Sequence, residues 1–318
     1  MLMSRDKRIR LKKEKRPHPS GKTARRMWDV SNEHIRDVMH SMAFMGPSLI
    51  GVSVFFIVPF LVVVYYSVIR SPINPEFVFL DNFIAVLKNS SFQTAAKNTA
   101  TFSIVAVPLA VVLSLGLALM LECRIPGKSW LRTFFLSPMM VPIASIILIW
   151  QVLFHYNGVV NEFLAVFGAD KIDWLKSDYC MVVIVVLFLW KNLGYNMILF
   201  MAALSNIPRE LLEVAEVEGA SAAYQFFHIK LRYLSPTVLF VTILSIINSF
   251  KVFREIYLLT GNYPYDGLYM MQHFMNNMFN SADYQRLSAA AVLLAIVIVI
   301  LIALLFFVEN IFGKDVEG

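Results

Sequence analysis

Polar and charged side chains interrupt three apolar stretches of the sequence, and their types are those that bind a solute rather than transform one. They are Trp150 and Gln151 in the first stretch, Lys191, Asn192, Tyr195 and Asn196 in the second, and Asn248, Ser249, Lys251, Arg254 and Glu255 in the third. Amide, hydroxyl and charged groups can hydrogen-bond solute hydroxyls, while Trp and Tyr offer aromatic faces for packing. Because a polar group at membrane depth is costly unless it faces protein or water, these residues predict a solute pathway, with packing between helices as the alternative.

The rest of the chemical inventory argues against catalysis in this chain. The six histidines are scattered without metal-ligand spacing, and no cluster of acids or nucleophiles lies at one depth. Two lysine-containing stretches, Gly127-Lys128-Ser129 and "SGKTA", lack the first glycine of a phosphate-binding loop. We therefore expect no cofactor in this chain, and any energy for pumping has to come from an ion gradient or from a partner.

The elements that must position these residues are membrane-spanning helices. The chain has 318 residues, of which 58% are hydrophobic and only 16% charged, a composition that excludes an ordinary water-soluble globule. A spanning helix needs about 20 mostly apolar residues, and six such windows are predicted, at 43–69, 98–121, 133–155, 181–204, 234–258 and 287–308. Lys and Arg are concentrated in alternate connecting segments, which favours a multi-pass protein with both termini in the cytoplasm.

The basic N-terminal segment explains the net charge of +6. Because the stretch "RDKRIRLKKEKR" at 5–16 is one tail and the rest is nearly balanced, we expect attraction to anionic membrane lipid and no nucleic-acid partner.

The stretch "LLEVAEVEGASAAYQFFHIKLR" (211–232) lies in a predicted cytoplasmic loop, 206–233. Pro208 suits the first turn of a helix, and an apolar side alternates with an acidic side in the residues that follow. Gly219 can adopt the positive φ that ends a helix. The sequence therefore predicts two short amphipathic helices that meet at an angle at Gly219.

The same loop resembles the cytoplasmic signature of ABC importer permeases. Glu213, Ala215, Gly219, Ile229 and Leu231 reproduce the spacing E-x-A-x3-G-x9-I-x-L, and Ala220 follows the central glycine. The family usually has Ala at Val214 and Pro at Arg232. The resemblance implies that these residues form a coupling helix that docks on a separate ATP-hydrolysing subunit.

Longer stretches are similar to the carbohydrate branch of that family, the maltose, multiple-sugar and glycerol-phosphate type. They are "FFLSPMMVPIASIILIWQVLF" (134–154), "LWKNLGYNMILFMAALSNIPREL" (189–211) and "SFKVFREIYLLTG" (249–261). The resemblance implies an all-α integral membrane fold of the type I importer, with a cytoplasmic tail (1–42), a permease domain (43–312) and a short cytoplasmic C-terminus (313–318).

The resemblance also implies the partners. These are a second, related permease, two ATPase subunits that bind the ATP and Mg, and an extracellular or periplasmic solute-binding protein, in a bacterial or archaeal plasma membrane. Three alternatives stay open: an ABC permease for another nutrient such as an amino acid, an ion-coupled secondary transporter, and a membrane enzyme.

The charged residues of the predicted pathway allow two further interpretations, one for Lys251 and Arg254 and one for Lys191 and Glu255. Lys251 and Arg254 stand where the carbohydrate branch more often has Gln and Asp, so they favour an acidic sugar or sugar phosphate, or else they are paired or reach the membrane surface. A Lys191–Glu255 pair that only fixes helix packing is the second possibility.

Overall fold

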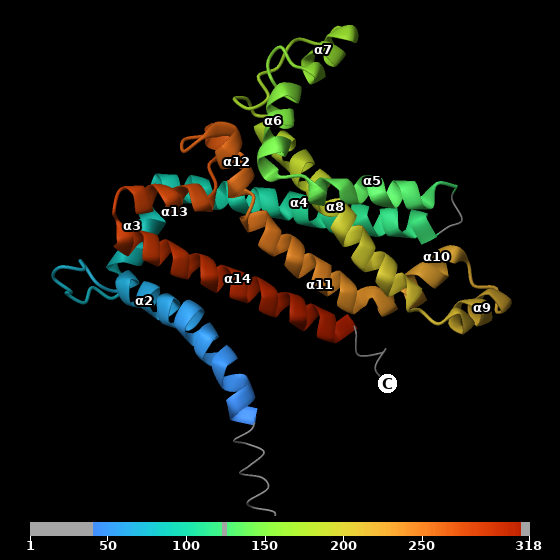
Figure 1. The fold of residues 1–318 in the computed structure, drawn as a ribbon, viewed down its shortest axis with the longest axis horizontal. Coiled ribbons are helices and arrows are strands. Elements are labelled where there is room, and N and C mark those ends of the chain that lie inside the picture. Colours follow the sequence, from blue (N-terminus) through green and yellow to red (C-terminus); the bar gives the residue numbers. More distant parts are fainter. Residues whose placement is uncertain (1–40, 123–125, 313–318) are drawn as a thin grey trace, which may run out of the picture. The chain divides into compact units, whose positions relative to one another are not determined.

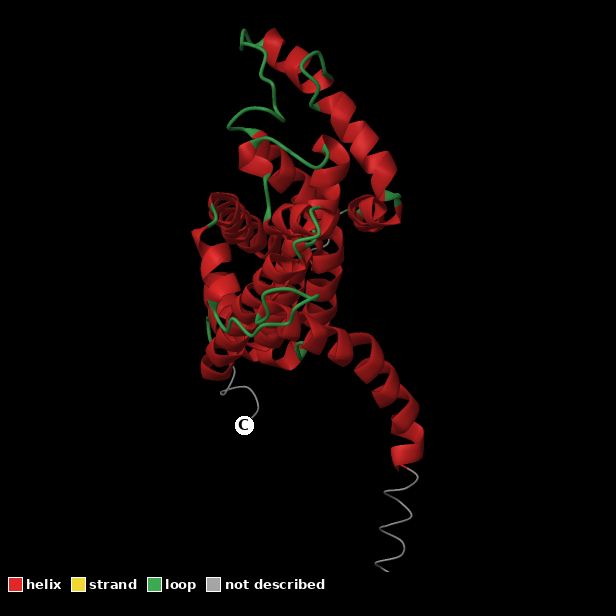
Figure 2. Ribbon diagram, turned by 90° about the vertical axis from the view of Figure 1, so that its left-hand side faces the viewer, coloured by secondary structure: helices red, strands yellow, loops and turns green. Residues whose placement is uncertain are grey.

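A computed structural model describes residues 41–122 and 126–312, and within these residues the chain is almost entirely helical. The only extended pairing among them is an isolated antiparallel bridge between Ile69 and Phe77. Figure 2 shows helices joined by loops throughout. The predicted basic tail, apart from its last two residues, and the predicted C-terminus (313–318) lie outside the described residues. The chain forms two units with a boundary at Val62, and each is described by itself.

Among the described residues, five helices are long and apolar enough to cross a membrane. They are Ser41–Ser67, Ser90–Glu122, Cys180–Ser205, Ala222–Thr260 and Tyr284–Ile311. Each contains most or all of one predicted span, so the apolar windows at 43–69, 98–121, 181–204, 234–258 and 287–308 identify the helices correctly. The first is the helix that bridges the unit boundary, and it includes the wider turn η1 (Ser53–Ile57) and α2 (Val58–Ser67).

The predicted third span is wrong in one respect, because 133–155 is not one continuous helix. Helices α5 (Lys128–Met140) and α6 (Ile143–Leu153) meet at an angle of 102°. Val141 is extended, with φ −88° and ψ 131°, and Pro142 follows it. A proline disfavours the helical conformation of the residue before it and has no N–H to continue the helical ladder. The described chain thus has five candidate spans, or six if the bent pair counts as one.

The loop at 206–233 also departs from its prediction. The first predicted short helix exists as α9 (Arg209–Val217). The second, α10 (Ala222–Gln225), does not end but passes through the wide turn η2 (Phe226–Lys230) into α11 (Leu231–Phe250). Arg232 therefore lies inside a continuous helix, as the second residue of α11.

The second unit is built on the long helices α4 (Ser90–Glu122) and α8 (Cys180–Ser205), which pack along each other. Helix α11 contacts both, and α14 (Tyr284–Phe312) lies beside α11 (Figure 1). Two buried clusters fill the contact of α4 with α8, one around Phe102 and Phe188, whose rings are 5.4 Å apart, and one around Phe200. These clusters fix the face of α8 from which polar side chains project.

Short helices complete the unit at the ends of the long ones. They are α3 (Asp81–Lys88), α7 (Val159–Val166), α12 (Phe253–Thr260), η3 (Asp266–Leu268) and α13 (Met271–Asn280). Helix α12 follows α11 after a two-residue turn at Lys251 and Val252. Helix α13 packs on α4 and α14, with the Phe274 ring 5.4 Å from that of Phe92.

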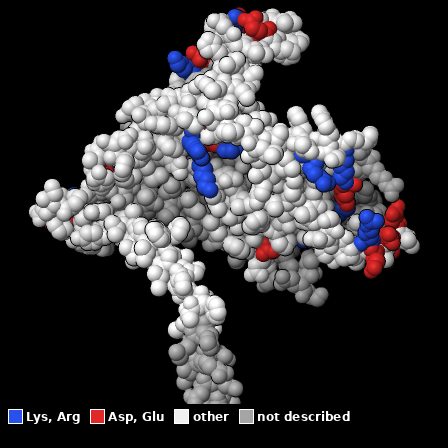
Figure 3. Space-filling model, in the orientation of Figure 1, with Lys and Arg blue, Asp and Glu red and all other residues white. Residues whose placement is uncertain are grey.

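The surface is that of a membrane protein. Figure 3 shows large uncharged areas, with Lys, Arg, Asp and Glu gathered in a few groups. Bulky apolar side chains such as Val299 and Phe307 on α14 are more than half exposed. Apolar area on this scale is typical of a surface covered by lipid or by a partner chain.

Candidate functional site: a polar cavity and the loop at 206–233

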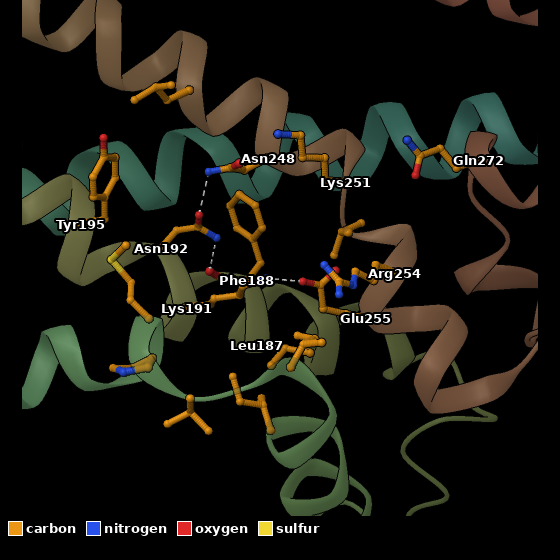
Figure 4. A pocket seen from close by; sticks show the side chains of 17 residues that line it. Leu187, Phe188, Lys191, Asn192, Tyr195, Asn248, Lys251, Arg254, Glu255 and Gln272 are labelled. Carbon is orange, nitrogen blue, oxygen red and sulfur yellow. Dashed lines mark hydrogen bonds and ion pairs between the residues drawn. The ribbon is translucent and has the colours of Figure 1, made fainter.

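A cavity of about 630 Å³ lies between three parts of the chain: the break from α5 to α6, helix α8, and the turn from α11 to α12. Seven of the predicted pathway residues line it: Lys191, Asn192, Tyr195, Asn248, Lys251, Arg254 and Glu255. Figure 4 shows them converging from α8 on one side and from α11 and α12 on the other. Residues 64 positions apart in the sequence therefore share one polar space.

Two asparagines form the neutral part of this lining. Asn192 donates from Nδ2 to the Phe188 carbonyl oxygen at 2.8 Å, one turn earlier in α8. Asn248 donates from Nδ2 to Asn192 Oδ1 at 3.0 Å, across the gap to α11 (Figure 4). The chain of bonds fixes the orientation of both amides. An Asn has two donors and two acceptor lone pairs, so each amide keeps capacity for a solute hydroxyl.

The charged part of the lining contains one ion pair. Lys191 Nζ contacts Glu255 Oε1, joining α8 to α12 (Figure 4). Glu255 is buried, and its second oxygen, Oε2, has no hydrogen-bond partner. The pair that the sequence suggested as a packing contact thus exists, and it also faces the cavity.

Four predicted pathway residues do not line the cavity. Trp150 is buried, with its ring 5.2 Å from Trp190 and 6.0 Å from Phe154. Asn196 and Ser249 are buried in bonds between helices, Asn196 to Ser245 at 3.1 Å and Ser249 to Ser103 at 2.9 Å. Gln151 is half-buried outside the lining.

Sequence reasoning missed one polar residue of the cavity. Gln272 on α13 lines it, although α13 belongs to a stretch expected outside the spans. Its place depends on the turn at residues 261–270, which folds α13 back over α4. Thr99 Oγ1 anchors that turn by accepting from the Met271 N–H at 2.9 Å. No local signal in the sequence indicates this return.

The loop at 206–233 has a defined local geometry. Helix α9 ends in a left-handed residue, Gly219, with φ +82°, as predicted. The Gly219 N–H donates to the Glu216 carbonyl oxygen at 3.0 Å, and the Ala220 N–H donates to that of Ala215 at 2.9 Å. Both bonds satisfy carbonyl groups that a helix end leaves free. Ser221 then caps the next helix by accepting from the Tyr224 N–H at 3.3 Å.

Two hollows flank this loop. One of about 750 Å³ is lined by Glu213 together with basic and acidic groups of α4, α5 and α9, namely Glu122, Lys128, Arg132, Arg209 and Glu216. A groove of about 420 Å³ on the loop's other side includes Ala215, Ala220 and Ile229 in its lining. Leu231 is half-buried at the start of α11. The signature residues thus surround one turn rather than forming a single cluster.

The residues that the structure describes contain no group of three or more His, Cys, Asp or Glu side chains that could hold a metal ion.

Comparison with known proteins identifies relatives of this chain. A family described as "Binding-protein-dependent transport system inner membrane component" matches residues 110–318. The chain is 33% identical over 253 residues to the trehalose/maltose transport system permease protein MalF of Thermococcus litoralis, covering 78% of this chain and 85% of that protein. It is 32% identical over 223 residues to the sn-glycerol-3-phosphate transport system permease protein UgpA of Yersinia enterocolitica, covering 69% and 76%.

A solved structure has a similar fold. It is a bacterial ABC transporter involved in the import of the acidic polysaccharide alginate, and one of its chains superposes with a TM-score of 0.76. The match covers 92% of this chain and 100% of that one, at 21% sequence identity.

Proposed function

The chain belongs to the family of binding-protein-dependent transport system inner membrane components, and on that premise we propose that it carries a sugar or oligosaccharide across a bacterial or archaeal plasma membrane. Membership makes it the permease subunit of an ABC importer, a non-catalytic membrane component, so the open alternatives of an enzyme and an ion-coupled transporter no longer apply. Relatives named for trehalose, maltose and glycerol phosphate support a carbohydrate substrate.

The main support for the proposal is the cavity beside the α5–α6 break, which is lined by side-chain amides and an aromatic ring. Asn192, Asn248 and Tyr195 offer the hydrogen bonds and the ring face that saccharides use. The cavity lies beside the α5–α6 break, and broken helices are common where a membrane protein lines a solute site. Six spans, with the bent pair as the third and both termini cytoplasmic, complete the proposed topology.

The cytoplasmic loop is the proposed contact with the ATPase. Glu213 is exposed, and among the described residues it has no ion-pair partner, which supports a role in binding a second protein. Because an ATPase of this class works as a dimer and this chain offers one such loop, the complete importer has a second, related permease, two ATPase subunits and a solute-binding protein. Closure of the ATPase dimer moves the loop and switches the spans between inward-facing and outward-facing states.

Reconstitution of the complete importer tests the proposal. With the ATPase, the second permease and the binding protein in proteoliposomes, labelled saccharides should accumulate only when ATP is supplied. Glu213→Arg should lower ATPase co-purification and uptake at least tenfold. Glu210→Arg is the matched control, because Glu210 lies on the same helix and lines neither hollow. Uptake that persists without the ATPase, or equal behaviour of the two variants, contradicts the assignment.

A further inference from the structure

The polar cavity carries more positive than negative charge. Its lining includes three cationic side chains, Lys191, Lys251 and Arg254, and one carboxylate, that of Glu255. Since Lys191 is already paired with Glu255, the charges of Lys251 and Arg254 remain uncompensated. Within residues 41–122 and 126–312, neither of these two makes an ion pair or a side-chain hydrogen bond.

Both cations are held at the cavity by the local backbone. Lys251 follows the last residue of α11, and its N–H donates to the Asn248 carbonyl oxygen at 3.1 Å. Arg254 lies in the first turn of α12, where its N–H donates to the Lys251 carbonyl oxygen at 3.2 Å. The turn therefore fixes two exposed cationic side chains on the same side of the cavity (Figure 4).

The helix termini at this turn do not neutralise them. The C-terminus of α11 carries about half a negative charge and the N-terminus of α12 about half a positive charge. These contributions lie within three residues of each other and nearly cancel, which leaves two full positive charges. Two unpaired cations within a membrane-spanning region are costly unless they face water or an anion.

We propose that the substrate is an anionic saccharide, whose carboxylate or phosphate is bound by Lys251 and Arg254 while its hydroxyls meet Asn192, Asn248 and Gln272. This inference rests on the proposed function, since it names the class of sugar that the same cavity accepts. An Arg guanidinium binds carboxylate and phosphate through two parallel hydrogen bonds, and a Lys adds a compact charge. The neutral amides and the Tyr195 ring supply contacts that a small inorganic anion would not use.

Direct binding to the assembled importer in lipid nanodiscs, without the solute-binding protein, tests the inference. The probes are tritiated trigalacturonate, glucose 6-phosphate and neutral maltotriose, so that the first two distinguish a carboxylate from a phosphate. We expect one anionic probe to bind at least tenfold more tightly than maltotriose. Raising NaCl from about 50 to 300 mM should weaken only the anionic probe, because salt screens charge interactions.

Variants distinguish a loss of binding by the two cations from a loss of folding or assembly. The double change Lys251→Gln/Arg254→Gln should weaken the anionic probe at least tenfold and change maltotriose binding less than twofold. The charge-conserving Lys251→Arg/Arg254→Lys should retain most of the anionic binding, and Lys97→Gln, an exposed position of α4 outside the cavity lining, should match the parent. Basal ATPase activity and a monodisperse complex report that each variant is assembled.

Two outcomes overturn the inference: tighter binding of maltotriose than of both anionic probes, or a probe ratio that the double variant leaves unchanged. ATP-dependent uptake of maltotriose by the complete importer in proteoliposomes, with its solute-binding protein, would then keep the proposed function and remove only the anionic substrate. Neither binding nor uptake of any saccharide would remove both.

Discussion

Lys191 of α8 and Glu255 of α12, which are 64 residues apart in the sequence, form an ion pair between the two helices. The Glu255 side chain is 7% exposed and that of Lys191 is 37% exposed, so the carboxylate is buried while the ammonium reaches the cavity. The pair thus has two consequences. It holds α12 against α8, and it removes one cation and one anion from the charges that a solute meets.

Removal of Lys191 alone should destabilise the protein more than removal of both partners. Lys191→Met leaves the buried Glu255 carboxylate uncompensated, which costs about 3 kcal/mol of unfolding free energy. Lys191→Met/Glu255→Leu replaces the pair by apolar groups and should recover most of that loss. Denaturant titration of the purified permease in detergent, followed by circular dichroism, measures the three free energies. A double variant that is less stable than Lys191→Met would mean that the two side chains are not coupled.

The structure gathers part of the predicted set of pathway residues at one cavity and places the rest between helices. Seven polar residues of α8, α11 and α12 reach the cavity. Asn196 lies four residues after Asn192 and so was expected on the same side, yet it turns to Ser245 in the contact between α8 and α11. Composition and spacing cannot distinguish these cases, because polar residues in a membrane helix satisfy each other across helices as readily as they face a solute.

Helix positions were predicted well because apolar length is a local property, whereas breaks depend on single residues. The break between α5 and α6 falls at Pro142, after the extended Val141, while Pro108 and Pro236 lie inside continuous helices, so a proline in the sequence does not by itself say where a helix breaks. Gln272 reaches the cavity only through the return of α13 over α4, a long-range contact that no window of sequence contains.

Gly194 should be intolerant of any side chain. A Cβ at this position would lie 1.9 Å from the Phe135 carbonyl oxygen and 2.6 Å from its carbon, so Ala would push α5 away from α8. Overpacking of this kind costs about 1–3 kcal/mol, and we expect Gly194→Ala to lower the thermal midpoint by several degrees.

Gly116→Ala is the matched control, because a Cβ there meets nothing within 4 Å and the residue also lies inside a long helix, α4. Ala is the better helix former by about 1 kcal/mol, so this variant should be as stable as the parent or more so. A scanning-fluorimetry comparison of both variants decides the matter. Equal midpoints for Gly194→Ala and Gly116→Ala would contradict the close approach of α5 to α8.

Substitutions at Gly219 should be limited by the backbone conformation of this residue rather than by the space around it. A Cβ there meets no atom within 4 Å, but the φ of +82° is one that L side chains rarely adopt. Gly219→Ala should therefore cost about 1–2 kcal/mol locally, while Gly219→Asn should cost less because Asn tolerates the left-handed region. Hydrogen exchange of the amides at 216–222 measures the effect. Faster exchange in the Ala variant than in the Asn variant is expected, and the reverse order would be evidence against a left-handed turn.

His273 should make the protein sensitive to acid. It lies on α13, outside the candidate membrane spans, and burial lowers the pKa of its imidazole from 6.5 to about 4. The Met270 N–H donates to Nδ1 at 3.3 Å, and the ring stands edge-on to Phe253 at 4.6 Å. A depressed folded-state pKa means that the unfolded chain takes up the proton first as pH falls. The stabilising contribution of the neutral ring is present above pH 6.5 and is lost between pH 6.5 and 4.

Protonation of this histidine should lower the free energy of unfolding by about 3 kcal/mol between pH 7 and pH 4, since each unit of pKa difference corresponds to about 1.4 kcal/mol. Denaturant titrations at pH 7 and pH 4 should show that His273→Gln loses less stability than the parent over this interval, even if it is less stable at pH 7. His155→Gln replaces an exposed histidine and is the matched control for the substitution itself, with the same loss of stability expected as in the parent. If His273→Gln and the parent lost the same free energy between the two pH values, the imidazole would not be the group that couples protonation to unfolding.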